Sequence, residues 1–143
     1  MHKILFSVLL LISFSSIAND TTLKWQEIPE WKTPGIQAYV DVNNLTHEDS
    51  DNIKIVSGLV LFQYDVPVKI SVNNKNVAIT SVIRYYVVNC SSPMVLRVAD
   101  YYFNTEDLPL ATDEAIVTKA YKEKPLNIAD TNPLYKSFCP KYI

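Results

Sequence analysis

Two long runs of β-branched and aromatic residues, separated by a short polar segment, constrain the fold more than any other part of this 143-residue chain. The runs cover residues 77–90 and 94–103. Side chains of these types favour extended strands that pack on both sides. The Ser-Ser-Pro segment at 91–93 lies where a turn would join them, so the sequence predicts an antiparallel β-hairpin at the centre of the fold.

The register of this hairpin is predicted from its charges. Pairing Arg84 with Asp100 sets opposite charges directly across the two strands, and the same register pairs Tyr86 with Val98. Cross-strand pairs of opposite charge stabilise a sheet, and a slip by one residue would turn each side chain to the other face. We therefore predict this register along the whole hairpin.

The face of the hairpin opposite Arg84 is also largely apolar. A sheet with one face in water normally alternates apolar and polar residues, so this face needs cover from the rest of the chain, from a partner chain or from a ligand. Cover by the same chain is the common arrangement in layered folds. If a partner provides it, the candidate interface consists of Ile83, Tyr85, Val87, Val95, Tyr101 and Phe103.

The first 18 residues have the features of a secretory signal peptide. Lys3 gives a positive start, residues 4–12 form an apolar core, and 16–18 fit a small-x-small cleavage site. The mature chain, 19–143, is expected to form one domain. It has no cysteine near the cleavage site that could accept a lipid and no later stretch of membrane-spanning length. We expect export to the periplasm or the medium, and not a lipoprotein.

The two cysteines, Cys90 and Cys139, are predicted to form a disulfide in an oxidising compartment. Near the C-terminus, Asn132 can cap a short helix, Pro133 fits its first turn, and Pro140 follows its end. The disulfide would clamp this helix onto the Cys90 face of the hairpin. The predicted fold class is α+β: an antiparallel sheet of about five to six strands with a short, disulfide-clamped C-terminal helix.

The rest of the sheet is predicted from shorter patterns. Residues 36–42 alternate as a half-buried strand, and 53–62 are apolar enough for a central strand, with Gly58 at a bulge or a close approach. The sequence at 65–67 is expected to end that strand. The polar, acidic residues 43–52 are expected to form a solvated loop.

Residues 115–121 fit either a helical face or a short edge strand, and we favour the strand. This region also starts the one basic cluster of the chain, Lys119, Lys122 and Lys124. A solvated sheet edge is the common role for such lysines. The alternative is a docking patch for sulfated glycans or acidic proteins.

No motif of an enzyme, a metal site or a cofactor site is evident. His47 is the one histidine after the signal peptide, so a His-based triad or a multi-histidine zinc site is not available within one chain. The acidic residues 47–51 lack the ligand spacing and central glycine of a calcium loop. Arg84 and Asp100 are more simply an ion pair than a catalytic pair. A net charge of −2 argues against nucleic acid as a partner.

The order of features resembles the surface-adhesin protein E family of Gram-negative bacteria. The residues that carry the resemblance are Trp25, Tyr39-Val40-Asp41, the long strand into Cys90, Arg97 and Tyr102 on its partner strand, and Cys139. The resemblance implies a sheet flanked by a C-terminal helix and a homodimer that covers the second apolar face. For the founding member it also implies binding of host vitronectin, laminin and plasminogen. The missing lipidation cysteine departs from that member and places display on the outer surface in doubt.

We therefore expect a non-enzymatic binding protein of the bacterial envelope that contacts host matrix or serum proteins. The alternative is a periplasmic housekeeping or inhibitor-type module. Such a module would bind an envelope protein or a small apolar ligand through the face that carries Ile83, Tyr85 and Tyr101.

Overall fold

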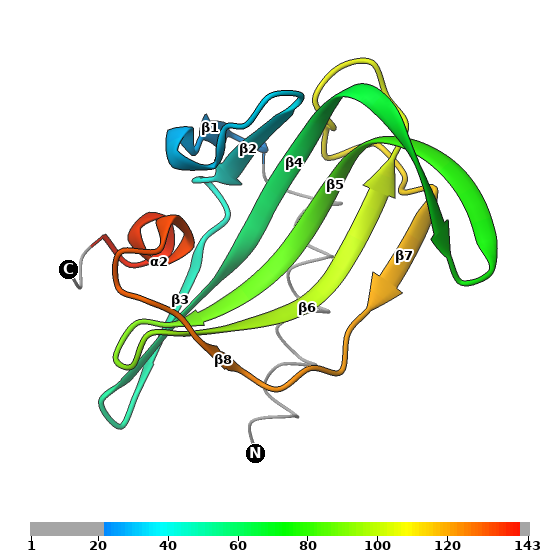
Figure 1. Cartoon of the computed structure of the whole chain (residues 1–143). Helices are drawn as coiled ribbons and strands as arrows, with labels where there is room; N and C mark the ends of the chain where they lie inside the picture. Colours follow the sequence, from blue (N-terminus) through cyan, green and yellow to red (C-terminus); the bar gives the residue numbers. More distant parts are fainter. Residues whose placement is uncertain (1–21, 141–143) are drawn as a thin grey trace.

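The computed structural model describes residues 22–140, in which eight antiparallel strands form one sheet and a single α-helix packs on it (Figure 1). The predicted signal peptide, 1–18, lies outside these residues. The strands are β1 (Trp25–Glu27), β2 (Ile36–Asp41), β3 (Thr46–Ser50), β4 (Ile53–Val72), β5 (Lys75–Asn89), β6 (Met94–Phe103), β7 (Val117–Ala120) and β8 (Leu126–Asn127). A 3₁₀ turn, η1, covers Pro29–Trp31, and helix α2 covers Pro133–Phe138.

The predicted fold class is confirmed in outline, but the predicted strand number is too low. The main path of the sheet is β1-β2-β4-β5-β6-β7, while β3 pairs with β4 and β8 pairs with β6. Strands β2, β6 and β7 fall where the sequence predicts them. The predicted loop at 43–52 is wrong, because β3 forms there and pairs with the first part of β4. Its polar residues are compatible with a strand because β3 lies at an edge and is mostly exposed.

Strand β4 continues past the predicted break at 65–67. The pairing with β5 shifts between Gln63 and Val68, so Pro67 falls in an irregular stretch where its missing N–H breaks no ladder bond. Asn73 and Asn74 have positive φ angles of 51° and 64°, which suits the tight turn of a two-residue hairpin. Strands β4 and β5 extend beyond the ends of their neighbours β2 and β6. There they pair with each other and form an arm.

This arm curls back over the sheet toward β7 (Figure 1). At its tip the Asn73 side-chain amide donates a hydrogen bond to the Thr118 carbonyl at 3.3 Å. Val72 from the arm forms a small buried cluster with Val82 and Tyr102. The curl makes the sheet face that carries α2 concave at this end.

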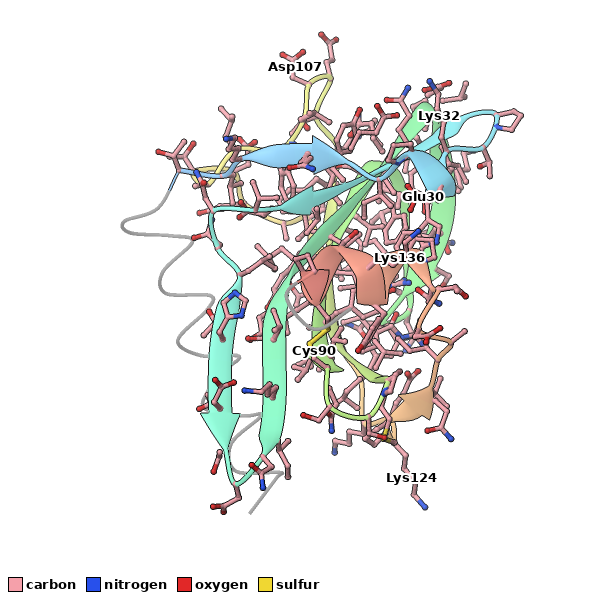
Figure 2. All side chains as sticks on the ribbon, turned by 90° about the vertical axis from the view of Figure 1, so that its left-hand side faces the viewer. Glu30, Lys32, Cys90, Asp107, Lys124 and Lys136 are labelled. Carbon is pink, nitrogen blue, oxygen red and sulfur yellow. A yellow bond between two sulfur atoms is a disulfide. The ribbon has the colours of Figure 1, made fainter. Side chains whose placement is uncertain are left out.

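At the other end of the same face, α2 is clamped as predicted. The Asn132 side chain accepts a hydrogen bond from the Leu134 N–H at 2.9 Å, which caps the helix. A disulfide joins Cys90 to Cys139 with a Cα–Cα distance of 5.7 Å, and it lies beside the helix in Figure 2. The Tyr135 hydroxyl donates to the Cys90 carbonyl at 2.8 Å. These contacts hold the helix to the end of β5.

Gly58 leaves room for the Leu45 side chain on the face of β4 that carries the helix. The pairing of β4 is regular at this residue, so the close approach is confirmed and the bulge is not. A Cβ atom at this position would lie 2.5 Å from Cδ2 of Leu45 and 3.5 Å from Cζ of Phe138. Glycine therefore makes room for the Leu45 side chain, while the fully buried Phe138 would lie at an ordinary contact distance from such a Cβ atom.

The disulfide closes a loop with a sequence separation of 49 residues. Replacing both cysteines, Cys90→Ser with Cys139→Ser, should lower the free energy of unfolding by about 4 kcal/mol, because the unfolded chain regains the freedom of that loop. Urea denaturation of the oxidised protein, the reduced protein and the double variant would measure this. Equal urea midpoints for the oxidised and reduced proteins would contradict the expectation.

Candidate functional site

A bulge in β6 determines which side chains share a face of the sheet. The predicted pairing of Arg84 with Asp100 is confirmed, and it extends to Tyr85 opposite Ala99. From there the pairing shifts, and Tyr86 lies opposite Arg97, so Val98 is the extra residue. The predicted register is therefore wrong between the bulge and the turn. Because side chains alternate along a strand, a shift by one residue exchanges the faces of β6 beyond this point.

The exchange changes the candidate interface at one position. Ile83, Tyr85, Val87 and Phe103 are buried in one cluster, and Tyr101 packs against it. Val95 instead packs against the cluster on the other face, which contains Cys90 and α2. Leu96 takes its place beside Val87. The structure thus brings five of the six predicted interface residues together.

We call the sheet face opposite α2 the apolar face. Its buried residues are Leu59, Leu61, Ile83, Tyr85, Val87, Leu96, Val98, Ala99 and Phe103. Part of its cover comes from the chain itself, since Trp25, Leu108 and Ala115 pack against it. The Trp25 indole N–H donates to the Pro109 carbonyl at 3.1 Å and ties the start of the described chain to the loop after β6.

Two cavities lie over the apolar face. The larger, of about 640 Å³, has a sheet floor and a wall from the loop before β7. Its described lining residues are Leu23, Leu59, Ile83, Tyr101, Phe103, Leu110, Ala111, Thr112, Asp113, Glu114, Ala115 and Thr118. The second, of about 470 Å³, is lined by Ile53, Ile55, Val87, Asn89, Met94, Val95, Leu96, Glu123, Lys124 and Pro125. Both offer mainly carbon surface with a few polar groups at the rim.

The other face carries a polar cluster centred on Asp100, which is fully buried. Its carboxylate accepts hydrogen bonds from Arg84 Nε at 2.6 Å and Nη2 at 2.9 Å. It also accepts from the hydroxyls of Tyr102 at 3.0 Å and Tyr121 at 2.6 Å. Burial alone would raise the pKa of Asp100, but the hydrogen bonds from Arg84 and Tyr121 and the charge of Arg84 lower that pKa below its ordinary value. The carboxylate is therefore ionised and saturated with donors.

Arg84 is fixed on this face by aromatic rings as well as by Asp100. Its guanidinium carbon lies 5.5 Å from the centre of the Phe62 ring and 6.0 Å from that of Tyr86. The Phe62 ring in turn stacks on Trp31, with ring centres 5.8 Å apart. The sheet, the rings and the carboxylate thus hold one orientation of the guanidinium.

A third cavity, of about 610 Å³, opens beside Arg84, and we call it the cationic pocket. It is lined by Arg84, Tyr86, Val95, Arg97, Glu123, Lys124 and Leu126. The Arg97 guanidinium lies 3.9 Å from the centre of the Tyr121 ring and forms an ion pair with Glu123. This pocket is not predicted from the sequence, because it depends on the bulge that sets Arg97 opposite Tyr86.

The predicted basic cluster is divided between two places. Lys119 Nζ lies 5.0 Å from the centre of the Tyr121 ring, beside the Asp100 cluster. Lys124 stands at the rim shared by the cationic pocket and the second cavity of the apolar face, and its side chain extends outward in Figure 2. Lys122 is exposed. Of the three lysines, only Lys124 lines any of the three cavities.

The described residues contain no group of three or more His, Cys, Asp or Glu side chains that could hold a metal ion. Between residues 22 and 140, no helix is long and apolar enough to cross a membrane. The chain matches no protein-family model, and no curated protein or solved structure is significantly similar to it. The resemblance to the surface-adhesin protein E family stays a prediction from the residues alone.

Replacing the buried carboxylate, Asp100→Asn, should lower the free energy of unfolding by about 3 kcal/mol, because the Arg84 charge loses its partner. Tyr121→Phe removes one donor and leaves the ion pair, so it should cost about 1 kcal/mol. Urea denaturation at neutral pH would measure both. Similar losses for the two variants would contradict a central role of the ion pair.

The pH dependence follows from the lowered pKa of Asp100. Its contribution to stability is fully present above the ordinary aspartate value of 3.8 and is lost as the pH falls through the lower pKa of the folded state. The stability difference between the wild type and Asp100→Asn should therefore shrink as the pH falls below that value. A difference that stays constant on acidification would contradict the assignment.

Proposed function

We propose that this protein is a non-enzymatic binding domain of the bacterial envelope and that it holds a small apolar ligand against the apolar face. The observation that carries the proposal is the pair of cavities, of about 640 Å³ and 470 Å³, on one face of the sheet. Ligand pockets have volumes of roughly 300–1,000 Å³ and are mainly apolar, with a few polar groups that fix orientation. In the larger cavity, Thr112, Asp113 and Glu114 supply those groups.

The chemistry of the other side chains supports binding rather than catalysis. Asp100 has its acceptor positions filled by Arg84 and two tyrosines, and its low pKa disfavours proton transfer near neutral pH. His47 lies on the exposed edge strand β3, away from the three cavities. The disulfide makes a rigid domain, which reduces the entropy lost when a ligand binds.

Adhesion to host matrix proteins, which the resemblance implies, is the second candidate. The exposed Lys119, Lys122 and Lys124 favour it, because they offer contacts to an acidic protein partner. The homodimer implied by the same resemblance would cover the apolar face and so compete with a small ligand. Native mass spectrometry of the mature chain with and without an apolar ligand would show whether a second copy of the chain or the ligand covers the apolar face.

The fluorescent probe N-phenyl-1-naphthylamine should bind the mature protein, residues 19–143, with enhanced emission. Thr118 lines the larger cavity opposite Tyr101, and its place on β7 fixes the direction of its side chain. Thr118→Trp should fill the cavity and weaken probe binding by about tenfold or more. Thr46→Trp, on the exposed edge strand β3, is the matched control and should bind as the wild type does.

Equal probe affinity in the Thr118→Trp and Thr46→Trp variants would exclude the larger cavity as the binding site. The second candidate is tested separately with immobilised vitronectin or laminin at physiological salt. Retention no greater than background would count against adhesion and would leave the proposal for a small apolar ligand unaffected.

A further inference from the structure

The cationic pocket joins three cations from separate parts of the chain. Arg84 comes from β5, Arg97 from β6, and Lys124 from the segment between β7 and β8. In a regular hairpin Arg97 would point to the apolar face, and the bulge at Val98 turns it to the face of Arg84. Bulges commonly redirect a side chain beside a functional site.

Both guanidinium groups are held in place before any ligand arrives. Arg84 is bound by Asp100 through Nε and Nη2, while its Nη1 makes a long contact of 3.4 Å to the Tyr86 hydroxyl. The guanidinium carbon of Arg97 lies over the Tyr121 ring, 3.9 Å from its centre. Since a planar guanidinium that is already fixed loses little freedom on binding, such a pair is suited to recognise an oxyanion.

The protein places one of its own carboxylates in this pocket. Glu123 pairs with Arg97, and both side chains are about one-third exposed, at 34% and 32%. Glu123 belongs to the exposed stretch before β8, so its side chain can leave without disturbing the core. Arg84 then stays paired with Asp100, while Arg97 and Lys124 are left with no carboxylate in the pocket lining, and the pocket gains an attraction for an external anion.

We propose that the cationic pocket is a second binding site, which takes a sulfate or phosphate ester group of a small organic molecule in exchange for the Glu123 carboxylate. The volume of about 610 Å³ exceeds what a bare inorganic anion needs and leaves room for the organic part. Val95 and Leu126 in the lining provide apolar contact for it. This site is on the opposite face from the larger apolar cavity, so it does not depend on the proposed function.

The test uses the mature protein and three probes: inorganic sulfate, inorganic phosphate and glucosamine 6-sulfate, at low ionic strength. Binding is followed by the arginine Nε–H signals in proton–nitrogen NMR spectra. The Arg97 signal should shift, and glucosamine 6-sulfate should bind about fivefold tighter than inorganic sulfate. Equal affinity for the three probes would overturn the inference that an ester is the ligand.

Three variants distinguish a specific binding site from a general attraction between charges. Glu123→Gln removes the internal competitor and should tighten binding of glucosamine 6-sulfate by about fivefold. Arg97→Gln should weaken it by about tenfold or more. Lys122→Gln removes an exposed charge from the same segment and should have little effect. If Lys122→Gln weakens binding as much as Arg97→Gln, or if Glu123→Gln binds no tighter, the proposal is wrong.

These residues lie at the surface, so the substitutions should leave the fold intact, and thermal unfolding of each variant provides the check. Lys124→Gln supplies a further variant at the pocket rim, where the side chain points away from the ribbon (Figure 2). It should weaken binding by about threefold or more through the lost charge. Unchanged affinity in both Arg97→Gln and Lys124→Gln would overturn the assignment of the pocket.

Discussion

Val98 of β6 has no pairing residue on β5, and this single extra residue determines which side chains each face of the sheet carries. Side chains alternate along a strand, so β6 presents one set of residues before the bulge and the opposite set after it. Leu96 therefore completes the apolar face, while Arg97 joins Arg84 on the face that carries α2. An unbroken hairpin would put a guanidinium into the apolar face, where its desolvation would be costly. The bulge thus separates an apolar surface from a polar one within one thin sheet.

Two further features hold these surfaces in place. The disulfide and the packing of Phe138 over Gly58 fix α2 at one end of the sheet. At the other end the arm of β4 and β5 curls back, and Asn73 bonds to β7. Between them the Asp100 cluster satisfies a buried charge with four hydrogen bonds. The sheet is therefore constrained at both ends and in the middle.

The parts predicted correctly from sequence depend on local signals. Asn132 and Pro133 specify the helix start, the two cysteines specify the clamp, and the charges of Arg84 and Asp100 specify the register near them. The bulge is not predicted from the sequence, because Val98 is a common strand residue and neither neighbour is a glycine that would indicate a bulge. Strand β3 was missed because its polar residues obtain their pairing from β4, which is a long-range contact. The cationic pocket follows from the bulge, and so the sequence alone could not predict it.

If the sheet face opposite α2 holds an apolar ligand, as we propose, NMR contacts between the probe and the protein will locate the probe on that face. With methyl-labelled mature protein and N-phenyl-1-naphthylamine, we expect intermolecular nuclear Overhauser effects to the methyl groups of Leu59 and Ile83, which line the larger cavity. Contacts confined to methyl groups such as those of Val60 and Val88, in the core beneath α2, would contradict it, as would the absence of any contact to the probe.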